Sequence, residues 1–366
     1  MIRVLIVEDL KTEREFLRHL LESTGDMEVV GMAVNGAEGV ELACQLAPDV
    51  ITMDINMPVM DGYQATRNIM ETCARPIVIL SANWDPDDVN RSFRALEAGA
   101  VTAMAKPFGF GHSQHESSVH KLITTVKAMA EVTVVTRYAR YRTQAAAPPH
   151  LLTSLPSKPT SERDRVVVIG ISTGGPPVLR NLLSRLPADL PAPILIVQHI
   201  SPGFLGGMRD WLQHSTPLSV RIPQADCNAE PGTVYLAPDD YQMGITNSLR
   251  ITLNKDAPEH SLRPSASYLF RQAAALGPRA IGCLLTGMGS DGARELALMR
   301  QNGAITLAQD RESSVVFGMP AEAIRLNGAT FVMPPDQIAA KLTELLVNSR
   351  STASHQTKEE AYDNRS

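Results

Sequence analysis

Residues 166–175 read VVVIGISTGG, an unbroken apolar run that ends in Ser172 and a pair of glycines. Two later runs have the same form, because PILIVQH ends at His199 and IGCLLTGMGSD ends at Asp291. None of them alternates apolar with polar residues, which is typical of strands buried on both faces of a parallel sheet. A turn rich in Gly or Pro and a helix-like stretch follow the first and third runs. The pattern therefore predicts successive βαβ units in a doubly wound, mainly parallel α/β domain.

The three reactive side chains are expected in one site, because right-handed crossovers bring the carboxyl ends of the strands to one edge of the sheet. A serine hydroxyl becomes a nucleophile when an imidazole takes its proton and a carboxylate holds that imidazole. The chain thus offers Ser172, His199 and Asp291 as a catalytic triad. The Gly-rich turns place Thr173 and Met288 where backbone N–H groups can face a substrate oxygen, so both are predicted to line an oxyanion hole.

Each triad residue also has an ordinary structural explanation. Ser172 could cap a helix or line an anion-binding turn, His199 could be a buried core histidine, and Asp291 could be a turn residue. GISTG matches the G-x-S-x-G nucleophile elbow, but α/β-hydrolases carry their residues in the order serine, acid, histidine. A P-loop is not favoured either, because the turn lacks the Gly-Lys-Ser/Thr ending.

The first half of the chain carries a second set of polar residues at strand ends. The run IRVLIV ends at Glu8 and Asp9, and a later apolar run ends at Asp54. Three carboxylates on one sheet edge repel each other unless a hard cation such as Mg²⁺ lies between them, and that ion would prepare Asp54 to attack a phosphoryl group. Two further runs bring the Ser81 hydroxyl and the Lys106 ammonium to the same edge.

These residues resemble the receiver domain of bacterial response regulators over about residues 1–130. The resemblance implies a flavodoxin-like, five-stranded parallel sheet in which Asp54 is phosphorylated and Ser81 and Lys106 sense the phosphate. It also implies a histidine kinase of the chemotaxis type as phosphodonor, and an Mg²⁺ site formed by Glu8, Asp9, Asp54 and the carbonyl of Asn56. The alternative is an acidic surface patch on a flavodoxin-like domain.

The second half, from about residue 165 to 345, resembles the chemotaxis protein-glutamate methylesterase, the CheB family. The motifs that carry the resemblance are GISTGG, IVQHISPGF, PGTVYLAP, RPSASYLF, LLTGMGSDGA and AQDRESSVVFGMPAEAI. The resemblance implies that Ser172, His199 and Asp291 hydrolyse glutamate methyl esters, and deamidate certain glutamines, on methyl-accepting chemoreceptors without a cofactor. Tyr241 and Gln242 depart from the pattern, since family members often carry a histidine before the methionine.

A length of 366 residues suggests about two domains. The predicted organisation is a receiver domain at 1–132, a flexible linker at 133–164, a methylesterase domain at 165–348 and a disordered tail at 349–366. Two rivals remain open. One is a phosphorylation-regulated module that docks on receptors without catalysis, and the other is a DNA-binding response regulator, which would need a compact basic helical output domain.

Composition and cysteine usage limit the possible partners and the compartment. The net charge is −5 with both signs dispersed, so no basic face for nucleic acid is expected. The four cysteines, Cys44, Cys73, Cys227 and Cys283, lack C-x-x-C spacing and are predicted to be reduced core residues. No signal peptide and no membrane-spanning run is recognised, so a soluble cytoplasmic protein without membrane insertion is expected.

Overall fold

A computed structural model of the chain describes residues 1–81, 86–132, 134, 150–151 and 165–348. The chain divides into two compact units, Met1–Ala147 and Pro148–Ser366. Most of the predicted linker and the whole predicted tail lie outside the described residues, so the domain boundaries stay predictions. Within the predicted linker, His150–Leu151 form a short strand, β6.

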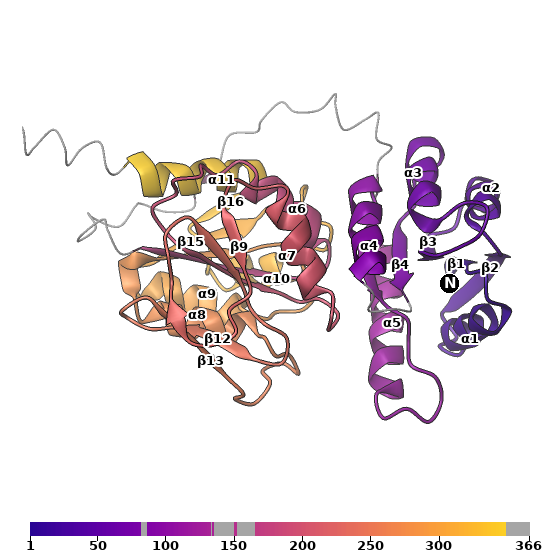
Figure 1. The fold of residues 1–366 in the computed structure, drawn as a ribbon, viewed down its shortest axis with the longest axis horizontal. Helices are drawn as coiled ribbons and strands as arrows, with labels where there is room; N and C mark the ends of the chain where they lie inside the picture. The colour runs from indigo at the N-terminus through magenta and orange to yellow at the C-terminus, as the bar shows by residue number, and fades with distance from the viewer. Residues whose placement is uncertain (82–85, 133, 135–149, 152–164, 349–366) are drawn as a thin grey trace, which may run out of the picture. The chain divides into compact units, whose positions relative to one another are not determined.

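The first unit is a five-stranded parallel sheet with helices, and this confirms the predicted receiver architecture (Figure 1). The strands run in the order β2-β1-β3-β4-β5, and every pair is parallel. Strands β3 and β4 are buried along their whole length, which explains their uninterrupted apolar sequences. The elements are β1 Ile2–Val7, α1 Lys11–Glu22, β2 Met27–Ala33, α2 Gly36–Leu46, β3 Val50–Asp54, α3 Gly62–Thr72, β4 Ile77–Ser81, α4 Pro86–Ala98, β5 Thr102–Ala105 and α5 His115–Ala130.

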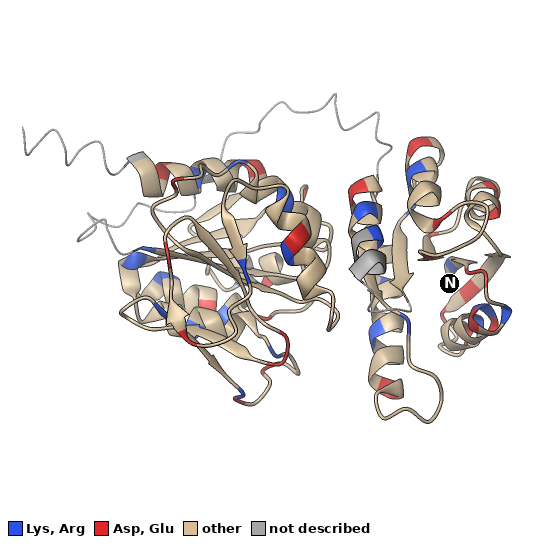
Figure 2. Ribbon diagram, in the orientation of Figure 1, with Lys and Arg blue, Asp and Glu red and all other residues tan. Residues whose placement is uncertain are grey.

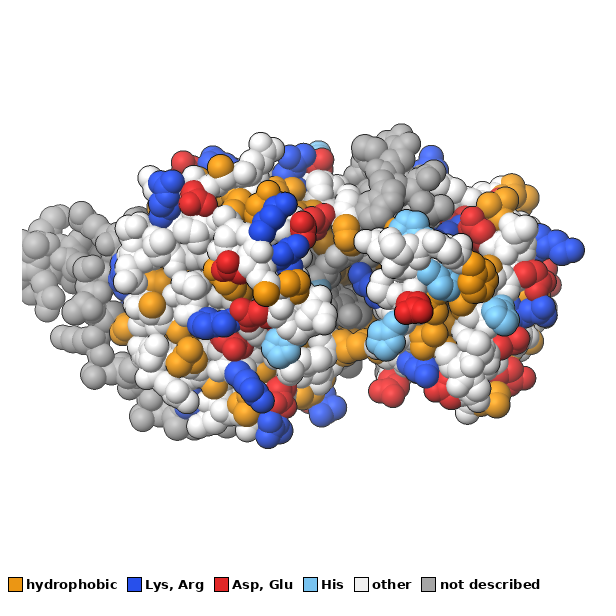
Figure 3. Space-filling model, turned by 90° about the horizontal axis from the view of Figure 1, so that it is seen from below, with side chains coloured by type: hydrophobic (Ala, Val, Ile, Leu, Met, Phe, Trp, Pro, Cys, Tyr) orange, Lys and Arg blue, Asp and Glu red, His pale blue; other side chains and the backbone are white. Residues whose placement is uncertain are grey.

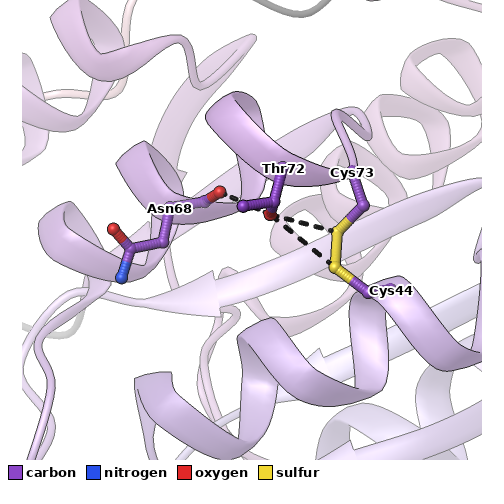
Figure 4. The surroundings of a disulfide bond; sticks show 4 residues. All are labelled: Cys44, Asn68, Thr72 and Cys73. Atoms are coloured by element: carbon purple, nitrogen blue, oxygen red, sulfur yellow. Dashed lines mark hydrogen bonds between the residues drawn. A yellow bond between two sulfur atoms is a disulfide. The ribbon is translucent and has the colours of Figure 1, made fainter.

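Cys44 and Cys73 form a disulfide in this unit, so the prediction that all four cysteines are reduced was wrong (Figure 4). Cys44 lies in the last turn of α2 and Cys73 directly follows α3. Their Cα atoms are 5.4 Å apart, a separation that a disulfide spans without backbone movement. The pairing was missed because sequence spacing does not show that the ends of two helices meet. Cys227 and Cys283 are free, and burial raises the pKa of the Cys283 thiol to about 12.

Reduction of this disulfide is expected to lower the free energy of unfolding of the first unit by about 3 to 4 kcal/mol, because the cross-link closes a loop across a sequence separation of 29 in the unfolded chain. Denaturant unfolding of the full chain, with hydrogen exchange reporting on each unit, measures the change with and without a dithiol reductant. The Cys44→Ser/Cys73→Ser double variant is the control. A reductant effect of equal size in that variant would contradict the expectation.

The second unit contains one large sheet and one small sheet, as expected for a mainly parallel α/β domain. The large sheet has eight strands in the order β6-β16-β15-β14-β7-β8-β11-β9, and only the edge pair β16 and β6 is antiparallel among the described strands. The small sheet is antiparallel in the order β10-β13-β12. The elements after β6 are β7 Val166–Ile171, α6 Gly175–Leu183, β8 Ile194–Gln198, α7 Leu205–Gln213, β9 Ser219–Arg221, β10 Cys227–Asn228, β11 Thr233–Leu236, β12 Gln242–Ile245, β13 Arg250–Asn254, α8 Ala266–Ala274, β14 Ala280–Leu284, α9 Ala293–Gln301, β15 Ile305–Gln309, α10 Met319–Arg325, β16 Phe331–Met333 and α11 Pro335–Thr343, with short helical turns at Gly277–Arg279 and Glu344–Asn348.

Strand β7 lies at the centre of this sheet, with β14 on one side and β8 on the other. Every residue of these three strands is buried. Helices α8 and α9 and the small sheet lie together beside the large sheet (Figure 1). Side chains of β7 and β8 share one buried hydrophobic cluster with them. The chain leaves β7 toward β8 and later returns to β14, so the order of strands reverses at β7. Ligands of open α/β sheets bind at the carboxyl ends of strands at such a reversal.

Charged side chains of both signs are interspersed over the described helices of the two units (Figure 2). On the face drawn in Figure 3, Lys and Arg side chains lie among Asp and Glu side chains, and the described residues there form no large field of one sign. Such a mixed surface does not attract a polyanion strongly. In the part of the chain that the structure describes, no helix has the length and apolar character needed to cross a membrane.

Candidate active site

The predicted triad residues follow three neighbouring strands of the large sheet. Ser172 follows β7, His199 follows β8, and Asp291 lies in the loop between β14 and α9. His199 N–H donates to the Ile171 carbonyl across the β7 and β8 ends at 3.0 Å. The sheet topology thus brings together three residues that are far apart in the sequence.

His199 and Asp291 are hydrogen-bonded to each other. The distance between His199 Nε2 and Asp291 Oδ2 is 2.9 Å, and the two side chains are 12% and 3% exposed. Burial raises the pKa of the Asp291 carboxyl. This pKa is lowered more by the hydrogen bond and the charge of His199, and by hydrogen bonds from Ser267 and Ser265. It therefore lies well below its usual range. Asp291 is therefore an ionised carboxylate that can orient the imidazole but does not take up its proton.

Ser172 is held in place by hydrogen bonds of its backbone. Its N–H donates to the Thr286 carbonyl at 2.9 Å, and its carbonyl accepts from Gln198 Nε2 at 2.9 Å. Among the described contacts, no hydrogen bond joins the Ser172 hydroxyl to His199. Catalytic hydrogen bonds are often long before substrate binds and shorten in the complex. The arrangement therefore permits the predicted pairing without yet making it.

The turn after β14 lies directly against Ser172. A Cβ added to Gly287 would lie 2.7 Å from Ser172 Cβ and 2.4 Å from Met319 Sδ, so only glycine allows this approach. The next residue is Met288, and neither its N–H nor that of Thr173 makes a hydrogen bond among the described contacts. Two unpaired N–H donors on either side of a serine are the elements of an oxyanion hole.

Several residues that support this site were missed by sequence reasoning. Gln198 donates to the carbonyls of both Ser172 and His199, at 2.9 and 2.8 Å. The Ser265 hydroxyl donates to Asp291 at 2.7 Å. Gln198 and Ser265 lie inside the quoted motifs. The sequence did not show that they bond to Ser172 and Asp291, because these partners lie in other loops.

The first unit gathers carboxylates at the carboxyl ends of β1 and β3. Single oxygen atoms of Glu8, Asp9 and Asp54 all lie within 4.8 Å of one another. Lys106 Nζ lies 2.7 Å from Glu8 and 3.1 Å from Asp54. It also lies 2.5 Å from Glu13 in α1, a contact that sequence reasoning missed. One ammonium thus faces three acids, which leaves the cluster with an excess of negative charge.

Burial and the neighbouring charges shift the pKa values of this cluster. Burial, with the nearby charges of Asp54 and Glu13, raises the pKa of Glu8 to about 7 despite the opposing effect of Lys106. Burial also raises the pKa of Asp54. For Lys106, burial lowers the pKa, but the surrounding carboxylates raise it more, so the ammonium stays charged. Hard oxygen donors with surplus negative charge are the chemistry that Mg²⁺ prefers.

The remaining predicted residues of the first unit also lie at this edge. Ser81 is the last residue of β4 and is buried, and its carbonyl accepts from Lys106 N–H at 2.9 Å. Asn56 follows β3 by two residues, and its side-chain oxygen accepts a hydrogen bond from Arg91 in α4. The structure therefore brings Ser81 and Lys106 together, with Asn56 in the loop after Asp54.

Comparison with known proteins gives matches over both units. A family model described as CheB methylesterase matches residues 167–342, and one described as response regulator receiver domain matches residues 4–115. The protein-glutamate methylesterase/protein-glutamine glutaminase of Nitrosospira multiformis is 49% identical over 353 residues, which cover 96% of this chain and 99% of the relative. A protein of the same name, number 4 of Geobacter metallireducens, is 48% identical over 348 residues, covering 94% and 99%. The solved catalytic domain of the Thermotoga maritima CheB methylesterase is 36% identical, covers 50% of this chain and 98% of its own, and has a TM-score of 0.48.

Proposed function

Because the chain belongs to the CheB methylesterase family, we propose that Ser172, His199 and Asp291 hydrolyse its substrates under the control of phosphorylation at Asp54. The protein is a serine hydrolase that demethylates glutamate methyl esters, and deamidates certain glutamines, on methyl-accepting chemoreceptors in a two-component chemosensory pathway. The observation that carries the residue assignment is the 2.9 Å contact between His199 and Asp291. These residues follow β8 and β14, the two strands that flank β7, and Ser172 follows β7.

The contact with the ionised Asp291 carboxylate supports a separate role for each ring nitrogen of His199. Since Nε2 donates to Asp291, Nδ1 is the nitrogen left without a proton and is the general base for Ser172. Ser172 Oγ attacks the ester carbonyl as its proton moves to Nδ1, and the N–H groups of Thr173 and Met288 stabilise the oxyanion. The proton on Nδ1 then passes to the ester oxygen, or to the amide nitrogen in deamidation, as its bond to carbon breaks, and methanol or ammonia leaves. Water then attacks the acyl-enzyme while Nδ1 takes its proton, and that proton returns to Ser172 Oγ as the carboxylate product is released.

In the receiver domain, Asp54 would accept the phosphoryl group, while the Lys106 ammonium and the Ser81 hydroxyl would bind its oxygens. Lys106 is already 3.1 Å from Asp54 Oδ1, so it needs only a small displacement to meet a phosphoryl oxygen. A bound Mg²⁺ would supply neutralisation of charge on the phosphoryl oxygens. The residues that fit it are Glu8, Asp9, Asp54 and the carbonyl of Asn56. The esterase site contains the groups that acyl transfer needs, and no cofactor is proposed for it.

The proposed partners follow from the two reactions. A chemotaxis-type histidine kinase would donate the phosphoryl group to Asp54, and the cytoplasmic helical domains of chemoreceptors would be the substrates. We place the protein in the cytoplasm, because both the kinase and these receptor domains act there. Neither reaction requires binding to nucleic acid or insertion into a membrane.

Asp54→Ala is expected to abolish stimulation of methanol release by a small-molecule phosphodonor while leaving unstimulated release within about twofold of wild type. The variant lacks the phosphoacceptor, but Asp54 belongs to a different sheet from the triad. The measurement is methanol release from methylated receptor cytoplasmic fragments, with and without phosphodonor. Asp49→Ala, which removes an exposed carboxylate that accepts from Arg3 N–H, is the control. Full stimulation of Asp54→Ala would show that another residue is the phosphoacceptor.

A further inference from the structure

The Asp291 carboxylate is held by four donors, and three of them come from the start of helix α8. Oδ1 accepts from Ser265 Oγ at 2.7 Å and from Ser267 N–H at 2.9 Å. Oδ2 accepts from Ala266 N–H at 2.7 Å and lies 2.9 Å from His199 Nε2. Each oxygen thus has two donors, so both the position and the rotation of the carboxylate are fixed.

The Ser265 hydroxyl both donates a hydrogen bond to Asp291 and caps helix α8. It is the N-cap of α8, has an extended backbone, and its Oγ accepts from Tyr268 N–H at 3.5 Å. The side chain is fully buried. A hydroxyl has a single proton to donate, and here the proton points to Asp291, while the lone pairs of the same oxygen cap the helix. The hydroxyl is therefore oriented from both sides.

The backbone of Ser265 is held in turn by Gln242, one of the two residues that depart from the expected family pattern. Gln242 is fully buried in β12, and its Oε1 accepts from Ser265 N–H at 2.9 Å. Its Nε2 lies 3.3 Å from the Ala257 carbonyl and 3.4 Å from the Leu262 carbonyl. One amide thus ties β12 to the loop that leads into α8, and this fixes the place from which the Ser265 hydroxyl acts.

We infer that Ser265 is a positioning residue for ester hydrolysis, acting on His199 through Asp291. The inference rests on the proposed roles of His199 and Asp291. A carboxylate with four donors cannot turn away from the imidazole, so it keeps the proton on Nε2 and leaves Nδ1 free to accept the Ser172 proton. The Ser265 hydroxyl also draws charge from Oδ1, which moderates the attraction of Asp291 for the imidazolium that forms during attack.

Ser265→Ala in the full chain should lower kcat for methanol release about tenfold and leave KM within about twofold, because one hydrogen bond to a charged group is lost while substrate contacts remain. The acid limb of the kcat/KM profile should move to higher pH, since a carboxylate with one donor fewer attracts the imidazolium more strongly. Asp291 is the charged partner of His199 among the described ion pairs. Ser265→Thr keeps a capping hydroxyl and should retain kcat within about threefold.

Ser265→Gly is the second variant, because glycine is accepted at an N-cap and lacks the hydroxyl, so it should reproduce the kinetics of Ser265→Ala even if the alanine variant folds poorly. Thr306→Val is the matched control, since it removes a buried hydroxyl that lies 3.1 Å from Thr330 Oγ1 near the start of β15. It should lose stability without a change in kcat or in the acid limb.

Wild-type kcat with an unmoved acid limb in a folded Ser265→Ala or Ser265→Gly variant overturns the inference. A loss of kcat without movement of the acid limb, or one matched by Thr306→Val, also overturns it, because it reports general structural damage. Methanol release that survives Ser172→Ala is a separate outcome. It would contradict the proposed triad itself, whatever the Ser265 variants show.

Discussion

Ser172→Ala is expected to reduce methanol release from methylated receptor fragments by a factor on the order of 10⁶ in kcat, down to the residual effect of the oxyanion donors and substrate binding. The physical reason is that Ser172 is the proposed nucleophile, and it follows β7, which lies between β8, the strand before His199, and β14, the strand before the loop of Asp291. Phosphodonor should not restore activity. The receiver domain can still be phosphorylated, but the nucleophile is gone.

The experiment compares wild type and Ser172→Ala, each with and without phosphodonor, and against several receptors. Ser184→Ala removes a serine hydroxyl from the end of α6 that bonds only to the Asn181 carbonyl among the described contacts, and it should behave as wild type. Release from Ser172→Ala at wild-type rates would return Ser172 to the role of a turn residue. No release from folded wild type on any receptor would favour a module that docks on receptors without catalysis.

Asp291→Asn is expected to lower kcat about 10⁴-fold with KM nearly unchanged, as for other triads that lose their carboxylate while keeping its shape. Both oxygens of Asp291 accept two hydrogen bonds, so the amide nitrogen of asparagine must face a donor in either orientation. If it faces His199, Nε2 must accept and Nδ1 carries the proton. The ring can then no longer act as a base toward Ser172.

The same variant has an expected effect on stability, measured as the free energy of unfolding against pH. The hydrogen bonds and the charge of His199 in the folded protein outweigh burial and lower the pKa of Asp291 below its usual value of about 3.9. The ionised carboxylate therefore adds stability above that pH, and this contribution is lost as the pH falls through the lower pKa of the folded state. The difference in the free energy of unfolding between wild type and Asp291→Asn should therefore become smaller below about pH 4.

Asp310→Asn is the control for both measurements, because Asp310 also accepts hydrogen bonds at the end of a strand of the same sheet, from Ser313, but has no contact with His199 among the described residues. It should retain wild-type kcat. Equal losses of kcat in Asp291→Asn and Asp310→Asn would show that the effect is not specific to the triad.

The sequence predicted the strands and the chemistry at their ends, because both depend on local patterns. An unbroken apolar run indicates a strand buried on both faces, and the side chain that follows it must lie at the sheet edge. This pattern alone predicted that Ser172, His199 and Asp291 lie at one edge of a sheet. It also predicted that Glu8, Asp9 and Asp54 lie together at the edge of a second sheet. Strand order was not predicted in the same way, since it depends on which helices pack on which face.

Residues whose roles depend on contacts between distant segments were missed. Ser265 bonds to a carboxylate 26 residues away in sequence, and Glu13 reaches Lys106 across 93 residues. In the sequence, Ser265 is one of two serines in a polar turn, and Glu13 is one of several charges in the first turns of a helix. Neither composition nor periodicity distinguishes such residues from a solvated surface. The Cys44–Cys73 disulfide was missed for the same reason.

Gly287 lies so close to Ser172 that it should not tolerate substitution, although it has no chemical function of its own. The space next to the nucleophile is smaller than one methyl group, so any side chain at position 287 would push apart the two loops that form the site. A screen of all single substitutions, scored only by enzyme activity, would rank Gly287 with the reactive residues although it has no side chain to react. Positions that do not tolerate substitution in this chain thus include Gly287, where the structure requires the absence of a side chain and not a functional group.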